Sequence, residues 1–182
     1  QQALFTSNGD LDIFVSKYSP NGTYLWTITM GGVNADFPRR MAIDYEDNFL
    51  ITGILQASAD FDPSPADENI LTCNGLHATM LAEYTKDDNH IWALQVNGLR
   101  QDWGQAVVID NENNIFLAGV MIDETDFDHS SGVAILNAGV QDAFIAKYNE
   151  NGVYQWAKNM GSLEQSDQSL DIVLDVNGDI FL

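Results

Sequence analysis

Short apolar runs alternate with polar turn segments along the whole chain. In the first part, runs rich in β-branched and aromatic residues occupy 12–18, 24–30, 41–44 and 48–55. Such runs are typical of β-strands. The segments between them, such as "SPNG" at 19–22 and "DYEDN" at 44–48, hold the Asn, Gly and Asp residues that hairpin turns favour. Since no segment keeps helical apolar spacing over three turns, the pattern predicts an all-β protein with little helix.

The same series of runs returns twice. "DIFVSKYSPNGTYLW", starting at Asp12, matches "DAFIAKYNENGVYQW", starting at Asp142, at eight of fifteen positions, and "ATMLAEYTKDDNHIW", starting at Ala78, keeps the same frame between them. A fixed period of about 65 residues indicates a repeat architecture. The expected repeats are 12–77, 78–141 and 142–182, with 1–11 as the tail of a preceding repeat, so 1–182 is expected to be one incomplete domain.

Strands that are apolar at successive positions narrow the choice of fold. "FLITGIL" at 49–55 and "IFLAGVM" at 115–121 show this pattern, whereas a strand with one solvated face alternates. Both faces need cover, and in an all-β repeat the neighbouring sheet supplies it. A β-solenoid has shorter repeats, and a β-sandwich needs about seven strands. We therefore predict a β-propeller fragment of four-stranded antiparallel blades, about 65 residues per repeat.

By analogy with propellers of similar repeat length, each blade can be outlined. The inner strands are expected at 41–44 and 48–55 and the outer strands at 79–84 and 91–96; blade one then runs from about Arg39 to Asn97 and blade two from about Gly104 to Met160. Half blades remain at both ends. Closing them on each other gives three blades, fewer than the usual four to eight. Further repeats of the same chain are therefore expected partners.

The turns and connections of such blades lie on opposite rims. The short hairpins rich in Asn, Gly and Asp share one rim, which we call the hairpin rim. The longer connections share the other, the connection rim; they are 31–38, 56–76, 97–104, 122–141 and 161–168. Function on rigid scaffolds concentrates on loops of this kind, so binding residues are expected on the connection rim.

One family carries this motif. The pattern "DxFxxKYxxNGxxxW", the following pair Gly31 and Gly32, and "DFDP" at 60–63 resemble the SBBP repeat, a β-propeller repeat of large secreted and cell-surface proteins, mostly bacterial. The resemblance covers nearly the full chain and implies an extracellular or cell-surface location. The second repeat departs most from the pattern, since Ala78 replaces the leading Asp and Glu83 replaces the Lys.

The charge of the chain excludes some partners. Its 27 Asp and Glu residues against 7 Lys and Arg give a formal net charge of −20, and 45% of its residues are hydrophobic. An acidic surface of this kind repels phosphate backbones and anionic lipids, so nucleic acid and membrane surfaces are poor partners. No apolar run reaches the length of a membrane span. Cys73 is the only cysteine, which rules out an internal disulfide.

Paired aspartates suggest a metal as one alternative. Side chains two residues apart on an extended strand share a face, so Asp60 with Asp62, and Asp126 with Asp128, place two carboxylates together in each of two repeats. Ca²⁺ prefers such oxygen ligands, and it is the one cofactor that the sequence leaves open. In the competing interpretation these carboxylates cap turns while Phe61 and Phe127 insert between blades.

Ligand-binding candidates lie on the connection rim. Asp36 and Asp102 recur at equivalent positions, with Asp167 as the third copy, whereas Arg39, Arg40 and Trp103 are not repeated. Arginine grips carboxylates with two parallel hydrogen bonds, so an anionic sugar or peptide is a conceivable ligand. The simpler interpretation pairs the arginines with local carboxylates such as Asp36.

Catalytic motifs are absent from the sequence, and the aspartates recur in each repeat, whereas an active site is built once from unlike residues. The leading hypothesis is a non-catalytic secreted or cell-surface module that binds or displays an unknown protein or glycan. One alternative is a propeller hydrolase or lyase whose site includes blades beyond these, which requires Arg39, Arg40 and Trp103 to converge. Another is a calcium-stiffened spacer.

Overall fold

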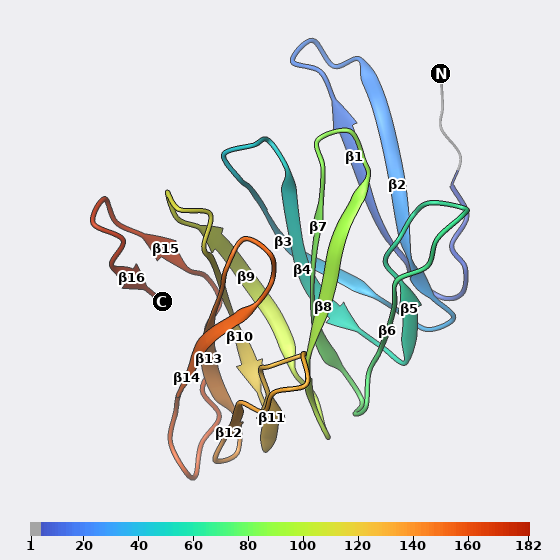
Figure 1. The fold of residues 1–182 in the computed structure, drawn as a ribbon. Helices are drawn as coiled ribbons and strands as arrows, with labels where there is room; N and C mark the ends of the chain where they lie inside the picture. The colour runs from blue at the N-terminus through green and yellow to red at the C-terminus, as the bar shows by residue number, and fades with distance from the viewer. Residues whose placement is uncertain (1–4) are drawn as a thin grey trace.

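The computed structural model describes residues 5–182, and all of their regular structure is β-strand (Figure 1). The strands are β1 (Ile13–Tyr18), β2 (Tyr24–Gly32), β3 (Phe37–Ile43), β4 (Phe49–Leu55), β5 (Ser58–Asp60), β6 (Ile70–Thr72), β7 (Ala78–Tyr84), β8 (His90–Gly98), β9 (Trp103–Ile109), β10 (Ile115–Met121), β11 (Glu124–Asp126), β12 (Ile135–Asn137), β13 (Asp142–Tyr148), β14 (Tyr154–Met160), β15 (Val173–Leu174) and β16 (Ile180–Phe181). Within this described part, no helix is long and apolar enough to cross a membrane. Residues 1–4 of the predicted tail lie outside it.

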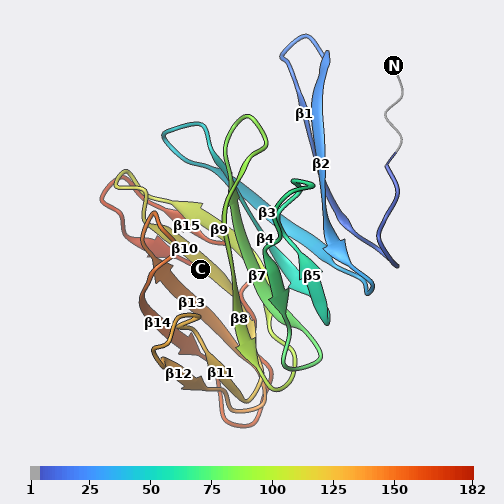
Figure 2. The same cartoon turned by 45° about the vertical axis from the view of Figure 1, so that its right-hand side comes forward.

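Two complete four-stranded blades form the centre of the structure. Blade one has the order β3-β4-β7-β8 and blade two the order β9-β10-β13-β14, with every neighbouring pair antiparallel. They span 37–98 and 103–160, within two residues of the predicted limits. The blades fan out between the half blades β1–β2 and β15–β16 (Figure 1, Figure 2). The predicted all-β propeller architecture of four-stranded antiparallel blades is confirmed.

Two of the predicted connections fold into short hairpins that link neighbouring blades. The connection after β4 forms β5–β6, and β5 pairs with β2 of the preceding half blade, where Asp60 lies opposite Gly31. The connection after β10 forms β11–β12 in the same way, and β11 pairs with β8 of blade one, where Thr125 lies opposite Gly98. The hairpin of each blade therefore adds two strands to the outer edge of the sheet before it. This pairing fixes the two sheets relative to each other.

The core consists of three apolar clusters, one between each pair of neighbouring sheets. All seven residues of β4 are buried, as are all seven of β10. In β4, Phe49 and Ile51 face the cluster shared with the half blade β1–β2, whereas Leu50 faces the cluster shared with blade two. Both faces of the strand are thus covered by neighbouring sheets, as the apolar residues on both of its faces predict.

The three repeated tryptophans occupy equivalent surroundings. Each is half-buried on the outer long strand of its blade or half blade (β2, β8 or β14) and shares a cluster with the first residue of the second strand in the following blade or half blade. The pairs are Trp26 with Phe49, Trp92 with Ile115, and Trp156 with Ile180. The ring of Trp26 stacks on Phe49 with centroids 5.7 Å apart. The tryptophans therefore serve packing between blades.

Replacing Tyr84 with phenylalanine should lower the free energy of unfolding by about 1–2 kcal/mol, because the buried Phe61 carbonyl would lose its partner. The Tyr84 hydroxyl, fully buried, donates to that carbonyl at 2.6 Å, and Tyr148 donates to the Phe127 carbonyl at 3.0 Å. Urea unfolding measures the change. The matched control is Tyr18→Phe, since Tyr18 is 60% exposed on the half blade. Equal losses in Tyr84→Phe and Tyr18→Phe would contradict this account.

Candidate functional site

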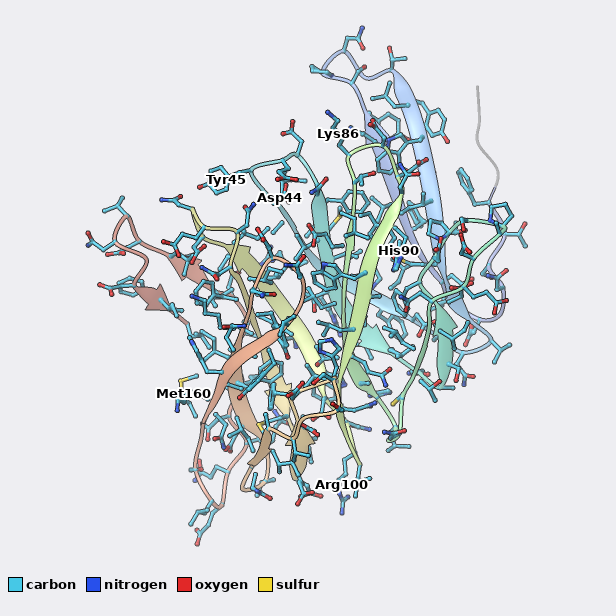
Figure 3. The ribbon with its side chains drawn as sticks, viewed as in Figure 1. Asp44, Tyr45, Lys86, His90, Arg100 and Met160 are labelled. Atoms are coloured by element: carbon cyan, nitrogen blue, oxygen red, sulfur yellow. The ribbon has the colours of Figure 1, made fainter. Side chains whose placement is uncertain are left out.

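The two rims of the blades differ as predicted. Asp44, Tyr45 and Lys86 lie in hairpin turns at one end of the blades, and Arg100 lies in a connection at the opposite end (Figure 3). The hairpins keep a repeated design: Asp44 accepts the backbone N–H groups of Glu46 and Asn48, each at 2.8 Å. The connection rim, by contrast, carries residues that differ from one repeat to the next, such as Trp103.

Two of the predicted ligand-binding residues, Asp36 and Asp102, are buried in the connections between blades. Asp36 is 1% exposed and accepts the backbone N–H groups of Gly32 at 3.0 Å and Gln56 at 2.9 Å. Burial raises the pKa of Asp36. Its carboxylate thereby links the end of β2 in the half blade to the residue that follows β4 in blade one.

Asp102 repeats this arrangement one blade later. It is fully buried, and its Oδ1 accepts the Ile122 N–H at 3.2 Å and the Thr125 hydroxyl at 2.9 Å. Burial raises the pKa of Asp102 to about 6. Both aspartates thus accept hydrogen bonds from the protein itself, and their carboxylates are turned inward, away from any ligand on the rim.

Trp103 belongs to a polar row at the junction of blades one and two, which we call the His77 cluster (Gln56, His77, Trp103). The Trp103 indole N–H donates to Nδ1 of His77 at 3.0 Å. Because an indole only donates, the neutral imidazole carries its proton on Nε2. The Gln56 amide lies 2.9 Å from Nε2 and completes the row when its oxygen faces the ring. Burial lowers the pKa of His77, which favours this neutral form.

Within residues 5–182, the His77 cluster occurs once. The register of the strands places Phe37 and Gln168 where Trp103 stands, Gln141 where His77 stands, and Ile122 where Gln56 stands. The connection 98–102 holds the cluster in place, since the Arg100 carbonyl accepts the N–H groups of Leu76 and His77. The Arg100 side chain forms an ion pair with Asp123 and is 66% exposed. Arg100 thus belongs to the connection that holds the cluster and precedes Trp103 by three residues in the chain.

Arg39 and Arg40 lie on the innermost strand of blade one, β3. A register shift between Pro38 and Arg40 leaves Arg39 in a β-bulge. Arg40 forms an ion pair with Asp171, in the connection before β15, with Nη2 3.2 Å from Oδ1. The two side chains are 49% and 64% exposed, so this ion pair contributes little stability. The unrepeated residues Arg40 and Trp103 therefore belong to two separate groups.

The paired aspartates cap turns in the β5–β6 and β11–β12 hairpins. Asp60 Oδ1 accepts the N–H groups of Asp62 and Asn69, and Asp126 Oδ1 accepts those of Asp128 and Ala134. Phe61 and Phe127, the residues between them, are fully buried between blades. Among residues 5–182, no group of three or more His, Cys, Asp or Glu side chains is arranged to hold a metal ion.

Two further residues of chemical interest are replacements within the repeat. Glu83, 6% exposed, stands where the other repeats have Lys17 and Lys147. Burial, and next the neighbouring Asp44 carboxyl, raises the pKa of Glu83 to about 7. His90 stands where the other repeats have a tyrosine. The replacements are visible in the sequence, but their surroundings are visible only in the structure.

Comparison with known proteins supports the fold rather than an activity. No protein-family model matches the chain. The chain is similar to an uncharacterized WD repeat-containing protein of Acanthamoeba polyphaga mimivirus, with 20% identity over 163 residues that cover 76% of this chain and 12% of that protein. The chain thus spans a small part of the relative's length. The SBBP resemblance stays a prediction from the motif, while the chain itself has a β-propeller-like repeat fold.

Proposed function

We propose that this chain is part of a non-catalytic β-propeller that binds a protein partner through its connection rim. The observation that carries the proposal is the His77 cluster with the neighbouring Arg100. Tryptophan and arginine are the side chains that most often dominate binding energy at protein interfaces. Trp103 is half-buried and held by His77, whereas Arg100 is exposed beside it. Such a pre-positioned aromatic side chain loses little conformational freedom on binding.

The different polar partners of the unrepeated residues favour binding over catalysis. A propeller enzyme of the kind considered from the sequence needs Arg39, Arg40 and Trp103 at one place. Arg40 is instead paired with Asp171, and Trp103 is hydrogen-bonded to His77. The printed name of the similar viral protein describes its repeats only, and this likeness supports a scaffold role for the chain. An extracellular or cell-surface location remains part of the proposal and follows from the SBBP resemblance.

Further repeats of the same kind are the second class of partner in this proposal. On the half blade, Phe14 is 64% exposed and Tyr18 is 60% exposed. Their counterparts in the complete blades, Met80 and Tyr84 in blade one, are fully buried against the preceding sheet. In each complete blade, the preceding sheet covers this apolar face. A further blade is therefore the occupant that fits the exposed face of the half blade.

The rim proposal predicts that Trp103→Ala or Arg100→Ala reduces recovery of protein partners at least tenfold when the immobilised full chain is compared with its variants by quantitative mass spectrometry. Asp47→Ala, in a turn on the hairpin rim, is the control and should leave recovery within twofold. A partner found in this way is then purified, and its Kd is measured for each variant. Equal recovery by all variants, or a ligand found only on a glycan array, would overturn the proposal. Thermal melting confirms that each variant is folded.

A further inference from the structure

A cavity of about 450 Å³ opens on the outer side of the blades, away from the His77 cluster. It lies between β2 of the half blade and the start of β8 in blade one, where Figure 3 labels His90. Thr27 and Thr29 line one wall, and the connection between β5 and β6 lines another. The volume falls in the range of about 300–1,000 Å³ that is typical of ligand pockets.

Two polar groups of this cavity, Asp88 and His90, are not repeated in blade two, whereas Asp62 recurs there as Asp128. The strand register places Asp88 where blade two has Gly152, and His90 where blade two has Tyr154. In blade two these positions are filled by apolar packing: Tyr154 joins the cluster between the blades, and a Cβ on Gly152 would lie 3.2 Å from the Trp92 ring. The cavity is therefore a feature of blade one, built by residues that depart from the repeat.

Three carboxylates line the cavity: Asp62, Asp67 and Asp88. Asp67 belongs to a connection that is one residue longer than its counterpart in blade two, since 63–68 corresponds to 129–133. The only basic group among the lining residues is the imidazole of His90. Burial lowers the pKa of His90 despite the nearby Asp62 and Asp60 carboxylates, which favours a neutral ring at pH 7. The cavity thus carries a net negative charge.

His90 supplies an observation independent of the acidic residues. Its side chain is 10% exposed and lines the cavity, and its Nδ1 lies 3.8 Å from Asp62 Oδ2, beyond hydrogen-bond distance. Its Nε2 is buried without a hydrogen-bond partner. A buried polar atom without a partner is energetically unfavourable. Because His90 lines the cavity, a ligand N–H group that displaces the ring enough to reach this nitrogen would give it a partner.

We propose that the cavity binds the side chain of an arginine residue presented by a protein partner. The guanidinium group carries five N–H donors and a fixed positive charge, which suit three carboxylates and an imidazole acceptor. Phe5, Ile28 and Pro63 offer apolar surface to the methylene stem. The net charge of −20 attracts basic protein surfaces over a longer range. A single metal ion would leave most of the cavity unfilled.

The test is fluorescence anisotropy with the full chain and a labelled peptide that carries two arginines in a Gly-Ser background. The matched peptide carries citrulline, which keeps the shape of arginine without its charge. We expect the arginine peptide to bind at least tenfold more tightly than the citrulline peptide. Asp88→Gly and His90→Tyr, which introduce residues found in other repeats, should each weaken binding at least tenfold. Asp67→Asn is a further variant that leaves the strands unchanged.

The control is Asp87→Asn, which makes the same change of charge as Asp67→Asn in an exposed residue outside the cavity lining. It should leave the Kd within twofold. An equal loss in Asp87→Asn and Asp67→Asn would overturn the proposal, because binding would then follow net charge alone. Competition by putrescine at the same concentration as the peptide would also overturn it, since the site would then take small amines. Rim variants such as Arg100→Ala should not affect this binding, so the two proposals fail separately.

Discussion

Replacing Glu83 with lysine should raise the free energy of unfolding at pH 8 by about 3 kcal/mol or more. In the native protein Glu83 is buried next to the Asp44 carboxyl, and at pH 8 Glu83 is ionised. A lysine at this position converts the repulsion into attraction. The other repeats show that the position accepts lysine, since Lys147 interacts with Asp110, the counterpart of Asp44. Urea unfolding of the full chain at pH 8 measures the difference.

The buried Glu83 should also make the stability of the native protein depend on pH. The pKa of Glu83 is raised in the folded state to about 7 from its ordinary value of 4.5, so the folded protein binds a proton more tightly than the unfolded chain. This contribution to stability is complete below pH 4.5 and is lost as the pH rises from about 4.5 to 7. A difference of 2.5 pKa units corresponds to about 3 kcal/mol. Glu83→Lys should remove this part of the pH dependence.

Glu83→Gln separates charge from shape. Its amide resembles the protonated carboxyl, so it should match the native protein at pH 4.5 and exceed its stability at pH 8. A residual slope is expected in both variants, because burial also raises the pKa of Asp102 to about 6. If Glu83→Gln kept the full pH dependence of the native protein, the assignment of that dependence to Glu83 would be wrong.

The repeat made much of the fold predictable. The strands of the complete blades are long enough for apolar content and turn residues to mark them. The apolar residues on both faces of β4 and β10 pointed correctly to cover on both faces. The hairpins β5–β6 and β11–β12 could not be found in this way. Each of their strands has only three residues, too few to show a periodicity, and they pair with a strand of another blade.

The site was less predictable, for a physical reason. Recurrence of Asp36 and Asp102 was a correct signal of a role shared by every blade, and the structure shows what that role is: acceptance of backbone N–H groups between sheets. The His77 cluster joins residues from positions 56, 77 and 103, which share no spacing. Their proximity depends on the packing of blade one against blade two, which a sequence pattern does not encode.

Replacing Gly119 with alanine should destabilise the fold by about 3 kcal/mol or more, because there is no space for a Cβ. The added atom would collide with the Trp103 carbonyl on the paired strand and lie 2.8 Å from the Phe144 ring. The register of β9 and β10 shifts between Ala118 and Gly119, which brings that carbonyl over the glycine. Urea unfolding measures the loss.

The matched control is Gly22→Ala. Gly22 has a φ of +80° and no atom within 4 Å of an added Cβ, so its replacement should lower stability by about 1 kcal/mol through backbone strain alone. A similar loss in both variants would show that the collision at Gly119 is relieved elsewhere.

The same collision also bears on function. The added Cβ would push β9 away from β10, and Trp103 is the first residue of β9. Gly119→Ala should therefore weaken the hydrogen bond to His77 and reduce partner binding at the connection rim, whereas arginine binding at the His90 cavity should persist below the melting temperature.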